Sequence, residues 1–437
     1  MYSESTTSNP TKAGDIVLLI TYVNIALYAL CYQLQRPVEP FLIKSLTEDH
    51  TDPGAVSRNY GRLEAFFSAI QTVGSPLVGI LLDRVGIRKT SALVFLSSAL
   101  SYGILSQAHT MPMLFFSKVP TALQHAFLVA QATAATSTAN DPADRAQALG
   151  RMTTAYTVGA TIGPALGGYL AGMGDLYLGA KMAIVGSLIS VVLSMLFLPN
   201  QHAPTHPKDH ISNVSQRGFI QELQHSYNIA LRSNLWPLLV VKVVGGFAAS
   251  MHSTALPMVL TQRLGFQPSQ LGLSMSTSMF TVAAFGAVAM APLAKWLGPP
   301  GMSQIGLLAR ALLATSTAMI ITTSVRNSEH ILMLVIVSGV LHALASHMLS
   351  TGLTTQTTGA VDKTEQGALL GLEHGLFSLA RIGAPPLGTT LLGTVGGFWT
   401  VAIACGSVDI ALITILISTA AQTAQIRTVK IDEVHSE

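Results

Sequence analysis

The sequence predicts an all-α membrane protein with twelve transmembrane helices arranged as two pseudo-symmetric six-helix bundles. This prediction depends on the scarcity of charge, a series of long apolar segments, and a polar break near the middle of the chain. Only 10% of the 437 residues are charged and 49% are hydrophobic, and the mean hydropathy is +0.49. Soluble proteins carry about 25% charged residues, so the composition indicates a chain that lies largely in lipid.

Each apolar segment is long enough to cross the hydrocarbon core, which takes about 20 helical residues. Helices are expected because the bilayer excludes open sheet edges and because the segments do not alternate as strands do. The expected spans are residues 15–43, 60–82, 90–108, 112–137, 146–172, 178–198, 235–261, 270–296, 302–323, 331–356, 366–392 and 397–420. The domain prediction is an N-terminal tail at 1–14, a bundle at 15–198, a cytoplasmic linker at 199–233, a bundle at 234–420 and a tail at 421–437.

The distribution of basic residues predicts that both termini are cytoplasmic. Of the 24 Lys and Arg residues, five lie within the spans, thirteen lie on the cytoplasmic side in this orientation and six lie on the outer side, following the positive-inside tendency. The segment before Asp15 is polar, and the first apolar run is too long for a cleavable signal peptide. The expected location is the plasma membrane or an intracellular organelle membrane, and the sequence does not distinguish the two. The net charge of +3 comes largely from loops, so no nucleic-acid partner is expected.

The two halves of the chain repeat each other at an offset of 221 residues. Around the fifth and eleventh spans, Gly150 aligns with Gly371, Pro164 with Pro385 and Gly167 with Gly388. Parallel repeats of six spans occur in transporters whose substrate site lies at the bilayer midplane between the halves. The repeat therefore predicts two related bundles.

A charged turn separates the second span from the third. It contains Gly79, Asp83, Arg84, Gly86 and Arg88, and it resembles the G-x-x-x-D-R-x-G-R-K signature loop of the major facilitator superfamily. In that family the loop works as a cytoplasmic gate, which the resemblance implies for these residues. A carboxylate at the end of a span can accept hydrogen bonds from a neighbouring helix N-terminus. The second half has Lys295-Trp296-Leu297-Gly298 in the same place, so the two gates are expected to be unequal.

The fifth span carries a second motif, formed by Gly159, Gly163, Pro164, Gly167 and Gly168. It resembles the G-x-x-x-G-P-x-x-G-G motif of the drug–proton antiporter branch of the superfamily. Glycines four residues apart let two helices approach closely, and a proline bends its helix. The expected element is a close-packed hinge, and the resemblance implies antiport.

Two further stretches resemble the organic cation transporter-like proteins of animals. One runs from Lys118 through His125 to Arg151, and the other runs from Gly371 to Arg381. The resemblance implies a secondary transporter of small organic solutes, with organic cations or amphiphilic drugs favoured, that exchanges them for protons by rocker-switch alternating access. It implies a monomer with no enzymatic activity and no cofactor apart from the proton gradient.

Ionisable groups inside a membrane span are costly, and each is a candidate functional residue. Glu373 is the expected proton-coupling carboxylate, because Arg381 follows it by eight residues on the same helical face. Arg36 and Glu39 are expected at the external mouth of the cavity. The remaining candidates for proton coupling or the substrate cavity are Lys118, His125, Tyr28 and Gln33.

Simpler roles stay open for all of these residues: structural ion pairs, Lys118 reaching the interface, and ordinary helix packing. His342 and His347 are five residues apart and make a poor metal pair. Asp409 is expected to be paired internally. Cys31 and Cys405 show no metal or disulfide spacing.

The substrate also stays open, because the spans hold five basic and four acidic groups, which does not describe a clearly cation-selective cavity. An anionic or zwitterionic substrate is one alternative. A membrane scaffold or sensor that keeps the fold without transport is another. The sequence contains no G-x-x-x-x-G-K-[ST] loop, which argues against ATP-driven transport.

Overall fold

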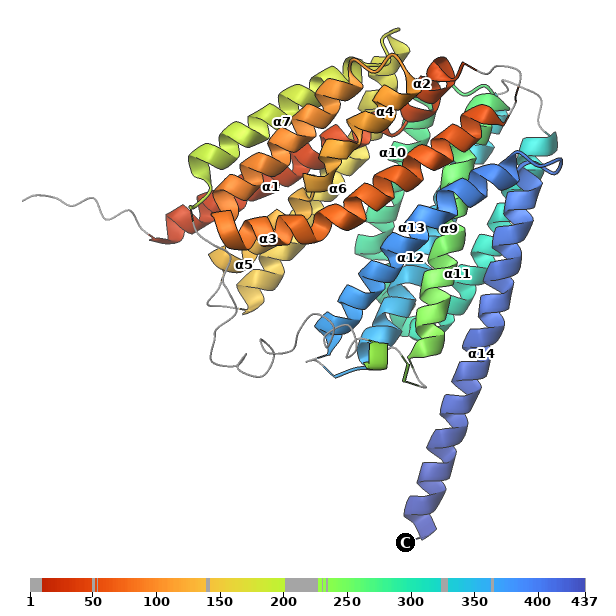
Figure 1. Cartoon of the computed structure of the whole chain (residues 1–437). Helices are drawn as coiled ribbons and strands as arrows, with labels where there is room; N and C mark the ends of the chain where they lie inside the picture. The colour runs from red at the N-terminus through yellow and green to blue at the C-terminus, as the bar shows by residue number, and fades with distance from the viewer. Residues whose placement is uncertain are drawn as a thin grey trace, which may run out of the picture. The chain divides into compact units, whose positions relative to one another are not determined.

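The structure is a computed structural model that describes residues 10–48, 52, 54–138, 142–200, 227–229, 231–232, 235–323, 329–362 and 365–436. These residues fold into helices, with no strand among them (Figure 1). Most of the expected 199–233 linker and residues 1–9 of the N-terminal tail lie outside the described residues. The bundle boundaries therefore stay a prediction.

The helices of the first half follow the expected spans, with breaks in two of them. They are α1 (Pro10–Gln35), α2 (Glu39–Leu46), α3 (Ala55–Leu105), α4 (Met111–Ser117), the 3₁₀ helix η1 (Val119–Leu123), α5 (Ala126–Ser137), α6 (Pro142–Gly172) and α7 (Leu178–Phe197). Those of the second half are α9 (Trp236–Gln262), α10 (Pro268–Val288), α11 (Met290–Thr323), α12 (Glu329–Gly359), α13 (Gln366–Leu392) and α14 (Phe398–Ser436).

Within the described part of the chain, nine helical segments are long and apolar enough to cross a membrane. One of them, α3, holds two expected spans, and α6 and α13 occupy the places of the fifth and eleventh spans. The helices thus account for all twelve spans.

The expected first and fourth spans are each interrupted at a proline. Helix α1 ends at Gln35, directly before Arg36-Pro37, because a residue that precedes proline is pushed out of the helical region. The fourth span breaks into α4, η1 and α5 around Pro120, which has no N–H to donate.

Side chains from neighbouring helices satisfy the backbone carbonyls at the second break. Ser101 donates its hydroxyl to the Ser117 carbonyl at 2.7 Å, and Gln71 donates Nε2 to the Thr121 carbonyl at 2.7 Å. Ser97 donates to the Pro120 carbonyl. These hydrogen bonds stabilise the break, because an unpaired carbonyl in lipid costs several kcal/mol.

A glycine with a left-handed backbone makes each of two tight turns between spans. Gly86 has φ 82° and ψ 172° inside α3, and Gly298 has φ 67° and ψ 163° inside α11. These values are essentially restricted to glycine. Gly298 follows Lys295 by three residues, as Gly86 follows Asp83. The second half has thus kept the geometry of the signature turn while losing its Asp-Arg pair.

The glycine motif of α6 forms a packing seam against α1. A Cβ atom at Gly159 would collide with the Ala26 carbonyl, and one at Gly167 would collide with the backbone of Leu34. A Cβ atom at Gly168 would instead collide with the Pro268 carbonyl at the start of α10. The motif therefore holds α6 close to two helices, and α1 and α6 pack along their lengths.

The seam recurs in the second half, where a Cβ at Gly388 of α13 would collide with the backbone of Met251 in α9. Gly388 is the repeat partner of Gly167. On another face of α13, Gly61 of α3 packs against the Pro385 and Pro386 backbone. The internal repeat thus predicts a real correspondence in packing.

Contacts divide the chain into two compact units. The first contains Met1–Leu46, Ile70–Ser212 and Gln267–Ser276, and the second contains Thr47–Ala69, Asn213–Phe266 and Thr277–Glu437. Each unit takes one short segment from the other half of the sequence. These segments are the ones that pack on the Gly-Pro stretches of α6 and α13.

Replacement of either turn glycine is expected to destabilise the protein. Gly86→Ala and Gly298→Ala each place a Cβ on a backbone that L-residues avoid, at a cost of about 1–3 kcal/mol. The measurement is the melting temperature of the purified protein in detergent. Gly103→Ala is the control, because Gly103 is helical with nothing near its Cβ position. Equal melting temperatures for Gly86→Ala and Gly103→Ala would show that the turn carries no such constraint.

The α1–α6 seam predicts a similar contrast within one helix. Gly167→Ala forces its Cβ into the Leu34 backbone and should cost about 1–3 kcal/mol through overpacking. Gly172→Ala should cost nothing, since the nearest atom to its Cβ position is 3.9 Å away, on Ser269. Thermal unfolding of the two variants checks this, and a smaller loss for Gly167→Ala than for Gly172→Ala contradicts it.

Candidate functional site

A buried ion pair connects α9, α12 and α13 in the second unit. Lys242 Nζ lies 2.6 Å from Glu373 Oε2 and donates a second hydrogen bond to Thr354 Oγ1 at 2.9 Å. The exposed fractions of the Lys242 and Glu373 side chains are 7% and 4%. The second carboxylate oxygen, Glu373 Oε1, is buried and has no hydrogen-bond partner among the described residues. This oxygen is thus a buried acceptor without a donor in the described part of the chain.

The base beside Glu373 is not the one that the sequence suggested. Arg381, on the same helix, is exposed, and eight residues of helix place its Cα about 12 Å along the axis from that of Glu373. Lys242 reaches the carboxylate from a neighbouring helix instead. Lys242 is one of the five basic residues within the expected spans, but the sequence does not indicate its partner.

A second buried ion pair joins α11 and α14 in the same unit. Arg310 Nη2 lies 3.2 Å from Asp409 Oδ1 and donates a hydrogen bond to the Gly245 carbonyl at 3.0 Å. Arg310 is 2% exposed and Asp409 is 1% exposed. The expectation that Asp409 is paired internally is confirmed. Pairing is required here, because an isolated charge at this depth would be strongly destabilising.

In the first unit, two basic residues converge on one carboxylate. Lys118 Nζ contacts Glu39 Oε1, and Arg36 Nη1 lies 3.7 Å from Glu39 Oε2. Glu39 is buried, whereas the Arg36 side chain is 29% exposed. The sequence treated Lys118 separately from the Arg36–Glu39 pair. The breaks in the first and fourth spans bring the three together, since α2 begins at Glu39 and η1 begins directly after Lys118.

Polar side chains surround the break in the fourth span. Tyr28 donates its hydroxyl to the Gln124 carbonyl at 3.1 Å, and Gln124 donates Nε2 to the Tyr102 hydroxyl at 3.0 Å. His125 occupies the N-cap position of α5 without a side-chain capping hydrogen bond, and its Nε2 atom is buried without a hydrogen-bond partner among the described residues. Gln33 is buried beside Gly163 on the α1–α6 seam.

The predicted cavity residues thus fall into two groups. Tyr28, Gln33, Lys118 and His125 belong to the first unit, and Glu373 and Arg381 belong to the second. Three further residues of these networks escaped sequence reasoning, namely Gln71, Tyr102 and Gln124. They are uncharged, so nothing in an apolar span singles them out.

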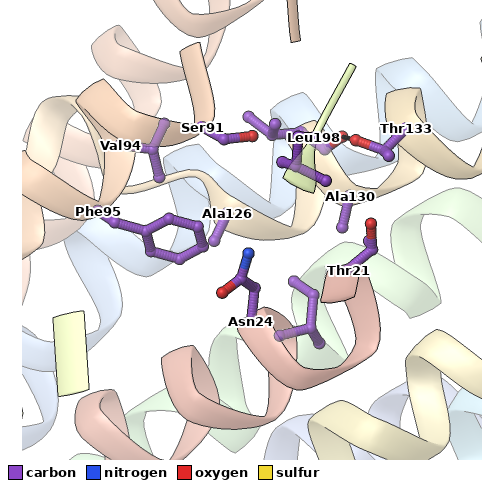
Figure 2. A pocket seen from close by; sticks show the side chains of 11 residues that line it. Thr21, Asn24, Ser91, Val94, Phe95, Ala126, Ala130, Thr133 and Leu198 are labelled. Atoms are coloured by element: carbon purple, nitrogen blue, oxygen red, sulfur yellow. Dashed lines mark hydrogen bonds between the residues drawn. The ribbon is translucent and has the colours of Figure 1, made fainter. Parts of the chain in front are cut away.

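A small cavity also lies in the first unit, between α1, α3 and α5 (Figure 2). Asn24, Thr21, Ser91 and Thr133 contribute polar atoms, and Phe95 closes one side. Asn24 donates Nδ2 to Ser194 Oγ at 3.1 Å, while its Oδ1 is buried and unpaired among the described residues. The free space fits about one water molecule. It is too small for an organic solute.

The gate residues lie at the turn within α3. Asp83 and Arg84 are exposed, and Gly79 has open space at its Cβ position. Arg88 donates Nε to the Leu198 carbonyl at 2.5 Å and so ties the turn to the end of α7. Gly86 provides the backbone reversal described above. The gate role of this turn stays a prediction.

Comparison with known proteins identifies the family. The chain matches the profile of the Major Facilitator Superfamily over residues 21–330 and 238–430. It is 25% identical over 388 residues to solute carrier family 22 member 18 of Mus musculus, which covers 87% of this chain and 90% of the mouse protein. It is also 25% identical over 381 residues to multidrug resistance protein 2 of Bacillus subtilis (strain 168), covering 86% and 88%.

The fold matches a solved structure as well. The crystal structure of the human organic anion transporter MFSD10 (TETRAN) superposes with a TM-score of 0.60 at 19% identity, covering 92% of this chain and 99% of that one. These similarities confirm the resemblance to the drug–proton antiporter branch and to the organic cation transporter-like proteins. The chain belongs to the Major Facilitator Superfamily.

Proposed function

We propose that this transporter of small solutes is a proton-coupled antiporter of organic cations, working by alternating access between its two halves. The observation that carries the proposal is the Lys242–Glu373 pair with its unpartnered carboxylate oxygen. We further infer a monomer with both termini in the cytoplasm, from the family resemblance and the positive-inside distribution.

The pair supports exchange because one buried carboxylate can be neutralised in three ways. Lys242 neutralises it in this structure, and a proton or an ammonium group of the substrate can take the place of the lysine. A buried charge must stay compensated, so these three cations compete for Glu373. Competition between proton and cation at one site is the physical basis of antiport.

Helix movement can follow from the same competition. When Glu373 is neutralised by a proton, Lys242 loses its counter-charge and keeps only its bond to Thr354. An ammonium in that position needs water or another acid. The packing of α9 against α12 and α13 is then biased toward a state in which the lysine is hydrated, as expected of a carrier with two alternating states.

A second candidate substrate class is organic anions. The expected spans hold five basic and four acidic groups. This small excess of positive charge favours an anionic solute, and a zwitterionic solute is a third candidate.

The first test is flux in proteoliposomes with an imposed pH gradient. Radiolabelled tetraethylammonium is expected to accumulate in the compartment with more protons, and a protonophore should abolish this accumulation. Radiolabelled p-aminohippurate is the anionic probe, and its transport in place of the cation would favour the second candidate. Movement of neither probe would favour a scaffold or sensor and would refute the proposed exchange.

Removal of the titratable group should uncouple transport from protons. In Glu373→Gln, uptake should lose its dependence on the pH gradient, and removing one partner of a buried pair should cost about 3–5 kcal/mol of stability. The double variant Lys242→Gln/Glu373→Gln removes both charges, so it should regain much of that stability while staying uncoupled. The two measurements are initial uptake rate against pH and the melting temperature.

Glu365→Gln is the matched control for this pair of variants. Glu365 directly precedes α13 and accepts hydrogen bonds from Arg232 at 2.6 and 2.7 Å. The Arg232 side chain is 42% exposed, so its ion pair should contribute only about 0–1 kcal/mol. Coupling should persist in this variant. If Glu373→Gln keeps the same pH dependence as Glu365→Gln, Glu373 does not couple transport to protons.

A further inference from the structure

The small polar cavity of the first unit is a feature that the Lys242–Glu373 mechanism does not use (Figure 2). Helix α1 packs along α6 and α7 and also contacts α5, but within the described residues it has no comparable backbone contact with α3. The cavity therefore lies where α1 and α3 meet through side chains rather than through closely packed backbones. Its polar wall consists of Thr21 and Asn24 of α1, Ser91 of α3 and Thr133 of α5.

One side chain on the wall of this cavity has an unused acceptor. Asn24 is 3% exposed, and its Nδ2 atom donates to Ser194 Oγ at 3.1 Å. Its Oδ1 atom is buried and has no hydrogen-bond partner in the described part of the chain. Because buried side-chain oxygens normally accept a hydrogen bond, this atom points to a ligand that can donate one.

The threonine hydroxyls of the cavity do not supply that donor. Thr21 donates Oγ1 to the Val17 carbonyl at 2.7 Å, and Thr133 donates Oγ1 to the Val129 carbonyl at 2.9 Å. A hydroxyl has a single hydrogen, and here each one is committed to its own helix, so the two oxygens offer only lone pairs to the cavity. Together with Asn24 Oδ1, three acceptors from two helices line the space.

The charges near the cavity favour a neutral donor over a cation. Its lining contains no acidic residue, and the carbonyl of Leu198, which also lines it, accepts a hydrogen bond from the Arg88 guanidinium. A monovalent cation would be a buried charge without a counter-ion, close to a positive group, and such a charge is strongly destabilising. The space fits about one water-sized sphere, which excludes larger neutral donors.

We propose that this cavity is a binding site for a single water molecule, which donates one hydrogen bond to Asn24 Oδ1 and the other to a threonine hydroxyl oxygen. Water has the required size, no charge and two hydrogens to donate. The Ser91 hydroxyl can donate to the water oxygen in turn, so one molecule links α1, α3 and α5. This inference does not depend on the proposed function.

The water site continues a polar connection that begins at the charged turn in α3. Arg88, two residues after Gly86, donates to the Leu198 carbonyl, and the Leu198 N–H donates to the Ser194 carbonyl at 3.2 Å. The Ser194 hydroxyl accepts from Asn24. The bound water therefore completes a path of hydrogen bonds from the turn, through the end of α7, to α1.

A density map of the wild-type protein at a resolution that shows ordered water is the first test. We expect one peak about 2.8 Å from Asn24 Oδ1, present both in sodium chloride and after sodium has been replaced by choline. A peak that disappears in choline would identify a cation and overturn the proposal. The lack of any peak at this position, beside well-defined side chains, would also overturn it.

A pair of threonine variants on α5 is the second test. Thr133→Val removes a partner of the water but keeps the shape of the side chain, so the melting temperature should fall by about 2 °C. Thr136→Val is the matched control, because Thr136 makes the same local hydrogen bond, to the Ala132 carbonyl at 2.8 Å, and does not line the cavity. Equal melting temperatures for the two variants would contradict a water held by Thr133.

Discussion

The absence of water inside the bilayer is the constraint on which this structure depends. Every charge and every interrupted backbone bond in a span must find its partner inside the protein. Glu373, Asp409 and Glu39 each lie against a base supplied by another helix. The break at Pro120 follows the same rule, since serine and glutamine side chains from α3 bond its carbonyls. Buried polar atoms that lack a hydrogen-bond partner among the described residues, such as Glu373 Oε1, are therefore candidates for a functional role.

Close backbone approach is the second requirement, because lipid offers no hydrophobic drive for helices to associate. The glycine seam between α6 and α1 meets this requirement, and its repeat partner between α13 and α9 does the same. Such a seam has little side-chain interlock. It holds two helices together while leaving the remaining faces of α6 and α13 to pack on short segments of α10 and α3.

The sequence was sufficient to predict features that depend on local pattern. Hydropathy predicts the spans, the charged turn predicts the reversal at Gly86, and the glycine spacing predicts the seam. The sequence did not predict which charged residues pair across helices, namely Lys242 with Glu373 and Lys118 with Glu39. Pairing depends on the rotation and depth of each helix, which no local pattern records. The helix breaks were within reach, because Pro37 and Pro120 are visible in the sequence, but prolines are common in spans that stay helical.

The two halves of the internal repeat share backbone conformation and close helix contacts, but their charged residues pair differently. Gly86 and Gly298 share an unusual conformation, and Gly167 and Gly388 share a close contact. In contrast, Glu39 of the first span pairs with Lys118 of the fourth, whereas Glu373 of the eleventh span pairs with Lys242 of the seventh. Under the repeat, a pair between the first and fourth spans corresponds to a pair between the seventh and tenth, so these two ion pairs are not symmetric. The two halves therefore share one backbone architecture and differ in their buried ion pairs.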